Sequence, residues 1–279
     1  MIWAPRFHKS NHYKYHWGWN FHNCKLQSIS SWFLFSFIVG GFLIAGGEVD
    51  GGQDELTEVI ELRQLVKTGS TPSFGQLPSK RYGAVGAMFG NSPILCGGTH
   101  KSGSSYFDSC ISFQNSQWTQ SHSMNEKRSF PAGVQINSTT FWILGGFDGA
   151  VLDSTEFIIQ GQTNGVPGPK LPYVLRIMCA VKLSEKEIFV IGGLGGGYRN
   201  EVWIYNPLNG FARNQGPSLN TPRDSHSCSI MKDGDKTFIV VVGGWNRHHL
   251  DSVEIYDSTD NTWHPGKQIP NLKKLYLNP

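Results

Sequence analysis

The stretch FIVVVGGW at 238–245, followed by SVEIY at 252–256 and a tryptophan at 263, decides the fold of this 279-residue chain. A short apolar run that ends in a Gly-Gly pair occurs five times, and the intervals between the pairs are 51, 48, 47 and 51 residues. A period near fifty residues indicates a repeat architecture, in which each repeat is one supersecondary unit. Because the core is then shared among repeats, we expect function in the loops at one face.

Each repeat carries the same further landmarks. An arginine stands 16 to 20 residues before the first glycine of the later four pairs, and a polar loop and a short alternating strand follow every pair. These strands are expected at 57–62, 109–113, 154–159, 201–205 and 252–256. The segments are too short for helices, so we predict four strands per repeat. The stretch at 55–66 also fits a helical pattern, but the repeat register predicts a strand there.

The Gly-Gly pair with its spaced tyrosine and tryptophan resembles the kelch repeat over about residues 46–270, and it does so best in the last repeat. The resemblance implies an all-β, kelch-type β-propeller of four-stranded blades, of which about five are visible. A closed five-bladed ring and an incomplete ring both remain open. The positions expected to be structural are Gly46, Gly47, Gly97, Gly98, Gly145, Gly146, Gly192, Gly193, Gly243, Gly244, Arg81, Arg128, Arg176, Arg223, Tyr205, Tyr256, Trp118 and Trp263. We expect the arginines to tie neighbouring blades together.

The N-terminal part differs from the propeller expected at 48–279. Residues 1–27 are basic and rich in histidine and aromatic residues, and we expect this leader to be disordered. Residues 28–47 carry no charge, and three interpretations remain open: the first strands of the first blade, a membrane-spanning segment, or a secretory signal. Membrane association is expected only through this segment.

Cysteine positions bear on the compartment. Cys96 and Cys110 fall on adjacent antiparallel strands, where a bridge is geometrically feasible, although two unpaired thiols remain the alternative. We expect Cys179 and Cys228 to be buried free thiols, because the inner strands of neighbouring blades should lie too far apart. Asn137-Ser138-Thr139 is a candidate glycosylation site. These signals favour a secreted or membrane-displayed protein over a cytoplasmic one.

No catalytic residue, metal site or cofactor is predicted. The histidines at 100, 122, 226, 248 and 249 have no spacing typical of metal ligands, and we expect them on surface loops. The GLGGG stretch at 193–197 precedes a strand and therefore lacks the helix that a phosphate-binding loop needs. The repeats carry no basic stripe, so nucleic-acid binding is not expected.

The resemblance implies that a protein partner of unknown identity docks on the loops after the Gly-Gly pairs and after the arginines. Carried over by register, that face contains Thr99, His100, Phe130, Phe147, Asp148, Met178, Leu194, Ser225, Trp245 and Asn246. These residues are mixed apolar and small, which does not suit a strongly acidic peptide. We predict a non-enzymatic interaction module or scaffold. The alternatives are a propeller enzyme of the sugar-oxidase or sugar-isomerase type, and a substrate-recognition subunit of a ubiquitin ligase that acts with a separate BTB chain.

Overall fold

The computed structural model describes residues 77–100 and 105–268, together with the backbone of five short strands between residues 34 and 61. These strands are β1 (Leu34–Ile38), β2 (Gly41–Ala45), β3 (Glu48–Val49), β4 (Gly52–Gln53) and β5 (Thr57–Glu61). Strands β1, β2 and β5 form an antiparallel sheet in that order, so the strand expected at 57–62 is confirmed. The leader at 1–27 and the first glycine pair, Gly46 and Gly47, lie outside the described residues.

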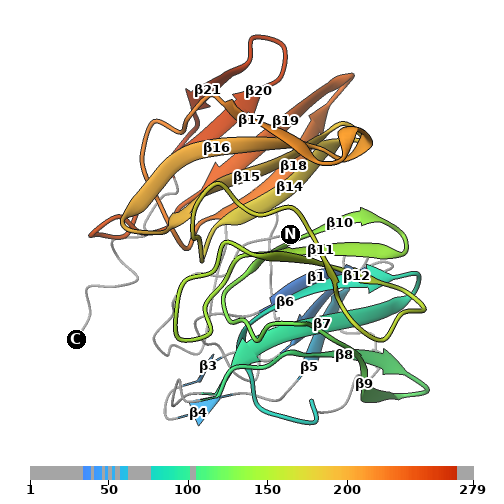
Figure 1. The fold of residues 1–279 in the computed structure, drawn as a ribbon. Coiled ribbons are helices and arrows are strands. Elements are labelled where there is room, and N and C mark those ends of the chain that lie inside the picture. Colours follow the sequence, from blue (N-terminus) through green and yellow to red (C-terminus); the bar gives the residue numbers. More distant parts are fainter. Residues whose placement is uncertain are drawn as a thin grey trace.

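Four sheets of four antiparallel strands follow, and we name them blades A to D (Figure 1). Blade A contains β6 (Tyr82–Phe89), β7 (Ser92–Thr99), β8 (Ser109–Gln114) and β9 (Gln117–Ser123); blade B contains β10 (Ala132–Asn137), β11 (Thr140–Leu144), β12 (Thr155–Ile159) and β13 (Val166–Pro167); blade C contains β14 (Cys179–Ser184), β15 (Glu187–Leu194), β16 (Tyr198–Asn206) and β17 (Ala212–Gly216); blade D contains β18 (Ser227–Asp233), β19 (Lys236–Val242), β20 (Val253–Asp257) and β21 (Thr262–Pro265). Within each blade the strands pair in chain order.

Only one helical turn interrupts these strands in the described part of the chain, the 3-10 helix η1 at Pro207–Asn209. Among the described residues, therefore, we find no helix with the length and apolar character needed to span a membrane. The four blades confirm the all-β propeller class predicted from the sequence, with four four-stranded blades described rather than five.

The burial pattern explains why the apolar runs form the second strand of each blade. In blade B, residues 141–144 of β11 are buried on both faces, as expected for a strand covered by the blades on either side. Strand β15 repeats this pattern at residues 188–191. In blade D, Ile239 and Val241 are buried, whereas Val240 and Val242 are half-buried, so one face of that strand is less well covered than its sequence suggests.

Large aromatic side chains fill the spaces between blades. The Trp142 indole of blade B has no exposed surface, and it packs against Tyr205 and Phe211 of blade C at ring distances of 5.1 Å and 4.9 Å. Trp263 of blade D is buried, and its indole N–H donates to the Pro217 carbonyl at 2.8 Å. The Trp142 and Trp263 side chains therefore fill the spaces between neighbouring sheets.

The inner strands of successive blades are joined by a series of backbone hydrogen bonds. The Phe130 N–H donates to the Gly83 carbonyl at 2.6 Å, the Ile177 N–H to the Phe130 carbonyl at 3.0 Å, and the Ser225 N–H to the Ile177 carbonyl at 3.2 Å. All four residues have positive φ values, between 53° and 65°. This conformation is uncommon for residues other than glycine, and its repetition at equivalent positions shows that the blade packing imposes it.

The Gly-Gly pairs add a second set of bonds between blades. The N–H of Gly98 donates to the Arg128 carbonyl at 2.9 Å, and the N–H of Gly193 donates to the Arg223 carbonyl at 2.9 Å. Gly97 has a φ of 70°, and a Cβ atom at this position would overlap the Arg128 carbonyl oxygen. Glycine is therefore required both by backbone conformation and by the close approach of the next blade.

Three of the predicted arginines are buried side chains that hold their own blade together. Arg128 donates to the Gly145 carbonyl at 2.8 Å and pairs with buried Glu156 at 2.7 Å. Arg223 repeats this geometry with the Gly243 carbonyl at 2.7 Å and Glu254 at 2.6 Å. Each arginine side chain thus binds groups of its own blade. The backbone carbonyls of Arg128 and Arg223, in contrast, accept hydrogen bonds from the preceding blade. The expected tie between blades is a backbone contact and not a side-chain contact.

Blade A keeps the arginine without a buried acidic partner. Arg81 donates to the carbonyls of Gly97 and Ser109, and Ile111 occupies the position that Glu156 holds in blade B. The Arg81 guanidinium lies 4.3 Å from the centre of the Phe107 ring. Burial lowers the pKa of Arg81 to about 10, and this group still carries its charge at neutral pH.

The alignment of Arg176 with the other three arginines is wrong by one residue. The carbonyl that accepts from Gly146 belongs to Leu175, and Arg176 instead pairs through its backbone with Leu194. The Glu156 position is filled by Trp203 in blade C. Blade C therefore replaces the buried ion pair with apolar side chains. The spacing from arginine to glycine varies among the repeats, so spacing alone could not detect this shift.

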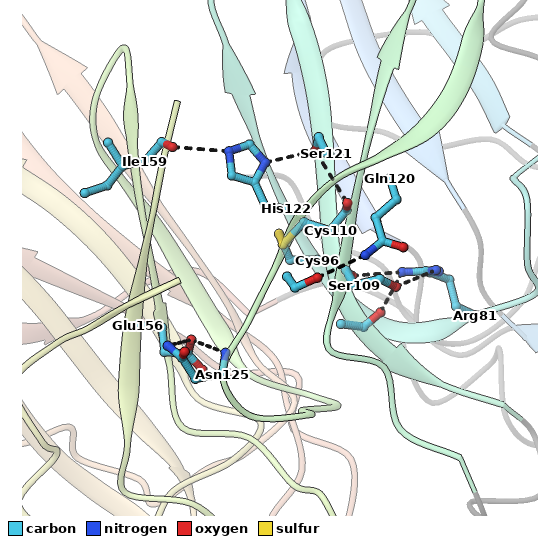
Figure 2. Close-up of a disulfide and its surroundings, with 12 residues drawn as sticks. Arg81, Cys96, Ser109, Cys110, Gln120, Ser121, His122, Asn125, Glu156 and Ile159 are labelled. Carbon is cyan, nitrogen blue, oxygen red and sulfur yellow. Dashed lines mark hydrogen bonds between the residues drawn. A yellow bond between two sulfur atoms is a disulfide. The ribbon is translucent and has the colours of Figure 1, made fainter. Parts of the chain in front are cut away.

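Two disulfides join described cysteines. Cys96 and Cys110 are direct partners on β7 and β8 with a Cα–Cα distance of 4.0 Å, which confirms the predicted bridge (Figure 2). The prediction of free thiols at Cys179 and Cys228 is wrong, because these residues form a disulfide between β14 and β18 with a Cα–Cα distance of 6.0 Å. The inner strands of neighbouring blades pack directly against each other, so they approach more closely than the sequence analysis assumed.

Replacing Arg128 tests the buried ion pair. We expect Arg128→Leu to lower the free energy of unfolding by about 3–5 kcal/mol, because Glu156 is left buried without its cationic partner. Lys170→Leu is the matched control, since the Lys170–Asp153 pair is exposed and should contribute at most about 1 kcal/mol. Urea unfolding measures both variants. Equal losses in the two variants would contradict this account.

Candidate protein-binding face

Each blade ends at its Gly-Gly pair in a row of three residues that are adjacent through backbone pairing. The first residue follows the buried arginine or its equivalent, the second follows the Gly-Gly pair, and the third closes the loop beyond it. The rows are Tyr82–Thr99–Tyr106, Ser129–Phe147–Val151, Arg176–Leu194–Tyr198 and Asp224–Trp245–His249. We call the surface formed by these rows and the loops beside them the Gly-Gly face.

Side-chain contacts connect the rows of neighbouring blades. The Tyr106 ring meets the Phe147 ring edge-on at 5.6 Å, and the Arg176 guanidinium lies 4.8 Å from the centre of the same ring. The Trp245 indole N–H donates to the Tyr198 hydroxyl at 3.0 Å. The side chains therefore form one continuous aromatic and cationic series across blades A to C, and a second contact joins blades C and D.

Charge on this face is balanced locally. Burial raises the pKa of Asp224, and the Ser225 hydroxyl and the positive charge of Arg176 oppose that shift. Asp148 is exposed, and its Oδ1 accepts from the Ala150 N–H at 3.1 Å within the loop. Arg247, in the loop after Trp245, is also exposed, so acidic and basic groups are mixed on this face and do not create a strongly charged surface of one sign.

Most residues expected on the binding face do lie at the Gly-Gly end of the blades. Asp148 is exposed, and the others are half-buried: Phe130, Phe147, Leu194, Ser225, Trp245 and Asn246. The Phe130 ring covers Gly83 and meets the Tyr82 ring edge-on at 5.6 Å. His100 is half-buried, and its ring packs on Phe107 at 4.9 Å.

Two of the expected residues cannot present their side chains to a partner. Thr99 is 1% exposed and donates its hydroxyl to the Ser105 carbonyl at 2.9 Å. Met178 is 6% exposed, and its terminal methyl lies against Gly145 of the preceding blade. Met178 was chosen because the sequence alignment of blade C is shifted by one residue at Arg176. The residue equivalent to Phe130 and Ser225 is Ile177.

Sequence reasoning missed Tyr106, Tyr198 and Arg176 as members of this face. A signal existed for one of them, because Val151, Tyr198 and His249 each stand four residues after the residue that follows Gly-Gly. In blade A the same loop is longer and places Tyr106 seven residues on, which hides the correspondence. The contacts between blades had no signal in the repeat pattern.

Two histidines expected on surface loops are buried. His122 of β9 contacts the Ile159 carbonyl of blade B at 3.2 Å (Figure 2). His226 is 8% exposed and lies against Gly192 of blade C. Burial lowers the pKa of His226 to about 3, nearby Arg223 lowers it further, and the carbonyls of Ile191 and Asp224 partly oppose the shift. Of the other three, His248 and His249 are exposed as expected, and His100 is half-buried.

The side chains in the described ranges do not assemble into a metal site. Neither ring nitrogen of His226 makes a well-aligned hydrogen bond to another described group, but the imidazole is enclosed by the blade interface. No group of three or more histidine, cysteine, aspartate or glutamate side chains with metal-binding geometry occurs among the described residues.

Comparison with known families agrees with this architecture. Radially repeated four-stranded sheets define the β-propeller class. The family model of the kelch motif matches residues 239–268, which contain most of β19, the last Gly-Gly pair, β20 and β21. The match and the repeated sheets together fit the kelch-repeat family. No curated protein matches the chain.

The buried imidazole of His226 makes stability depend on pH. The unfolded chain takes up a proton near pH 6.5, whereas the folded protein keeps His226 neutral down to about pH 3. Stability is therefore lost as pH falls below 6.5, by about 2 kcal/mol between pH 7 and pH 5 from this group alone. Blade C carries Met178 at the position equivalent to His226. The substitution His226→Met should therefore remove this part of the pH dependence.

Urea unfolding of both proteins at pH 7 and pH 5 measures the effect. We expect the wild type to lose more stability than His226→Met over this interval, since other titrating groups are common to both. An identical loss in the two proteins would show that His226 takes up its proton equally in the folded and unfolded states.

Proposed function

We propose that this protein is a non-enzymatic interaction module that binds a protein partner on the Gly-Gly face. Kelch repeats generally mediate protein–protein interaction and are typically non-enzymatic, and the matched motif lies within blade D. The observation that carries the proposal is the series of half-buried aromatic and arginine side chains, Tyr106, Phe147 and Arg176, that crosses three blades.

The chemistry of this series suits a protein interface. Tryptophan, tyrosine and arginine are enriched among the residues that contribute most to binding energy, because they combine large apolar area with a polar group. The Trp245 and Tyr198 side chains hold each other in place through their hydrogen bond. Side chains that are fixed before binding lose less conformational entropy when a partner docks.

The balance of charge narrows the partner class. Arg176 is offset by Asp224, the first residue of the neighbouring row, and the exposed loop residues Asp148 and Arg247 add one negative and one positive charge. A strongly acidic peptide would gain little from such a surface. The expected partner therefore presents apolar or aromatic side chains with few charges.

Trp245→Ala tests the proposal by affinity capture. We expect purified wild-type protein to enrich a reproducible set of proteins from extracts of the cells that express it, and we expect Trp245→Ala and Phe147→Ala to lose that set by tenfold or more. Truncation of an interface anchor typically costs about 2 kcal/mol or more, which corresponds to a loss of this size. Quantitative mass spectrometry of the captured proteins provides the measurement.

Leu208→Ala is the matched control. Leu208 is an exposed apolar side chain, 69% accessible, in η1. This turn lies at the end of β16 that is far from the Gly-Gly face. The control should capture the same proteins as the wild type, and urea unfolding should show that all variants are folded. Capture that is unchanged by Trp245→Ala and Phe147→Ala would refute the proposed face. A BTB-domain protein in the set would identify the ligase alternative, and turnover of a sugar by the purified protein would favour the enzyme.

A further inference from the structure

We infer that Asn137 is a site of N-linked glycosylation and that its glycan lies on the face of the propeller opposite the Gly-Gly face. This inference does not depend on the proposed function. It rests on the local geometry of the only Asn-X-Ser/Thr sequence in the chain, on the pairing of the cysteines, and on the direction of two strands.

The acceptor asparagine lies at an accessible turn. Asn137 is the last residue of β10, and it is exposed together with Ser138 and Thr139 in the turn that leads to β11. Its Oδ1 accepts from the Thr139 N–H at 2.9 Å and from the Thr139 hydroxyl at 3.0 Å. The hydroxyl that defines the acceptor sequence is thus in contact with the side chain that would be modified. A bulky, hydrated glycan is tolerated at such a surface turn.

The disulfides indicate a compartment in which this modification takes place. All four cysteines among the described residues are paired, and each is buried with at most 4% of its surface exposed. Disulfides of this kind form and persist in the secretory pathway and are rare in the cytosol. Cys179 and Cys228 come from different blades and are 49 residues apart, so their pairing requires the propeller to assemble under oxidising conditions.

The strand directions place the glycan away from the binding face. At one end of the β10–β11 pair, Ala132 is opposite Leu144, which directly precedes the Gly-Gly pair. At the other end, Asn137 is opposite Thr140. Five residues of extended strand separate these ends by about 16 Å, since each residue advances about 3.3 Å. A glycan at Asn137 therefore covers the opposite face and leaves Phe147 accessible.

The test is expression of the full chain, with its own N-terminus, in a eukaryotic cell that glycosylates secretory proteins. We expect an enzyme that removes N-linked glycans to increase the gel mobility of the wild type by a single step. Mass spectrometry should then find aspartate at position 137, because enzymatic release converts a glycosylated asparagine to aspartate. The shift should be absent in Asn137→Gln and in Thr139→Ala, and it should remain in Thr139→Ser.

Asn261→Gln is the matched control, because Asn261-Thr262-Trp263 lacks the required hydroxyl residue at the third position. This variant should shift as the wild type does. A wild-type chain that shows no shift, or a shift that survives both Asn137→Gln and Thr139→Ala, would overturn the inference. The outcome is separate from that of the capture experiment, since Trp245→Ala should be glycosylated as fully as the wild type.

Discussion

The series of backbone hydrogen bonds that joins Gly83, Phe130, Ile177 and Ser225 is the constraint on which the rest of the structure depends. Each bond links the inner strand of one blade to that of the next, and each requires a positive φ that most side chains disfavour. The bonds set the spacing of the inner strands. That spacing is close enough for Cys179 to reach Cys228 and for the rows of the Gly-Gly face to contact one another.

Within each blade a second constraint fixes the start of the inner strand. In blades B and D this is a buried arginine that satisfies the carbonyl next to Gly-Gly and pairs with a glutamate. Blade C fills the same positions with Leu175 and Trp203 and keeps the same backbone bonds. Since a buried ion pair and a well-packed apolar pair can be close in stability, the repeat accepts either one. The exchange also frees Arg176 to stand on the Gly-Gly face.

The sequence predicts features that repeat and fails where a repeat departs from its neighbours. The Gly-Gly spacing, the alternating strands and the partnership of Cys96 with Cys110 all follow from local pattern and strand pairing. The one-residue shift at Arg176 could not be found, because the arginine-to-glycine spacing is not constant. The Cys179–Cys228 bridge and the Tyr106–Phe147 contact depend on distances between blades, which a periodic pattern does not contain. Most loop positions on the Gly-Gly face were therefore predictable from the sequence, and the side-chain contacts that join those positions across blades were not.

Amide hydrogen exchange of the assembled protein tests whether these backbone hydrogen bonds hold neighbouring blades together. We expect the amides of Phe130, Ile177 and Ser225 to exchange as slowly as that of buried Val190, because opening any of them requires two blades to separate. The opposite result is exchange at these three amides as fast as at the exposed Asp235 turn, because these hydrogen bonds would then open without separation of the blades and could not set the spacing of the inner strands.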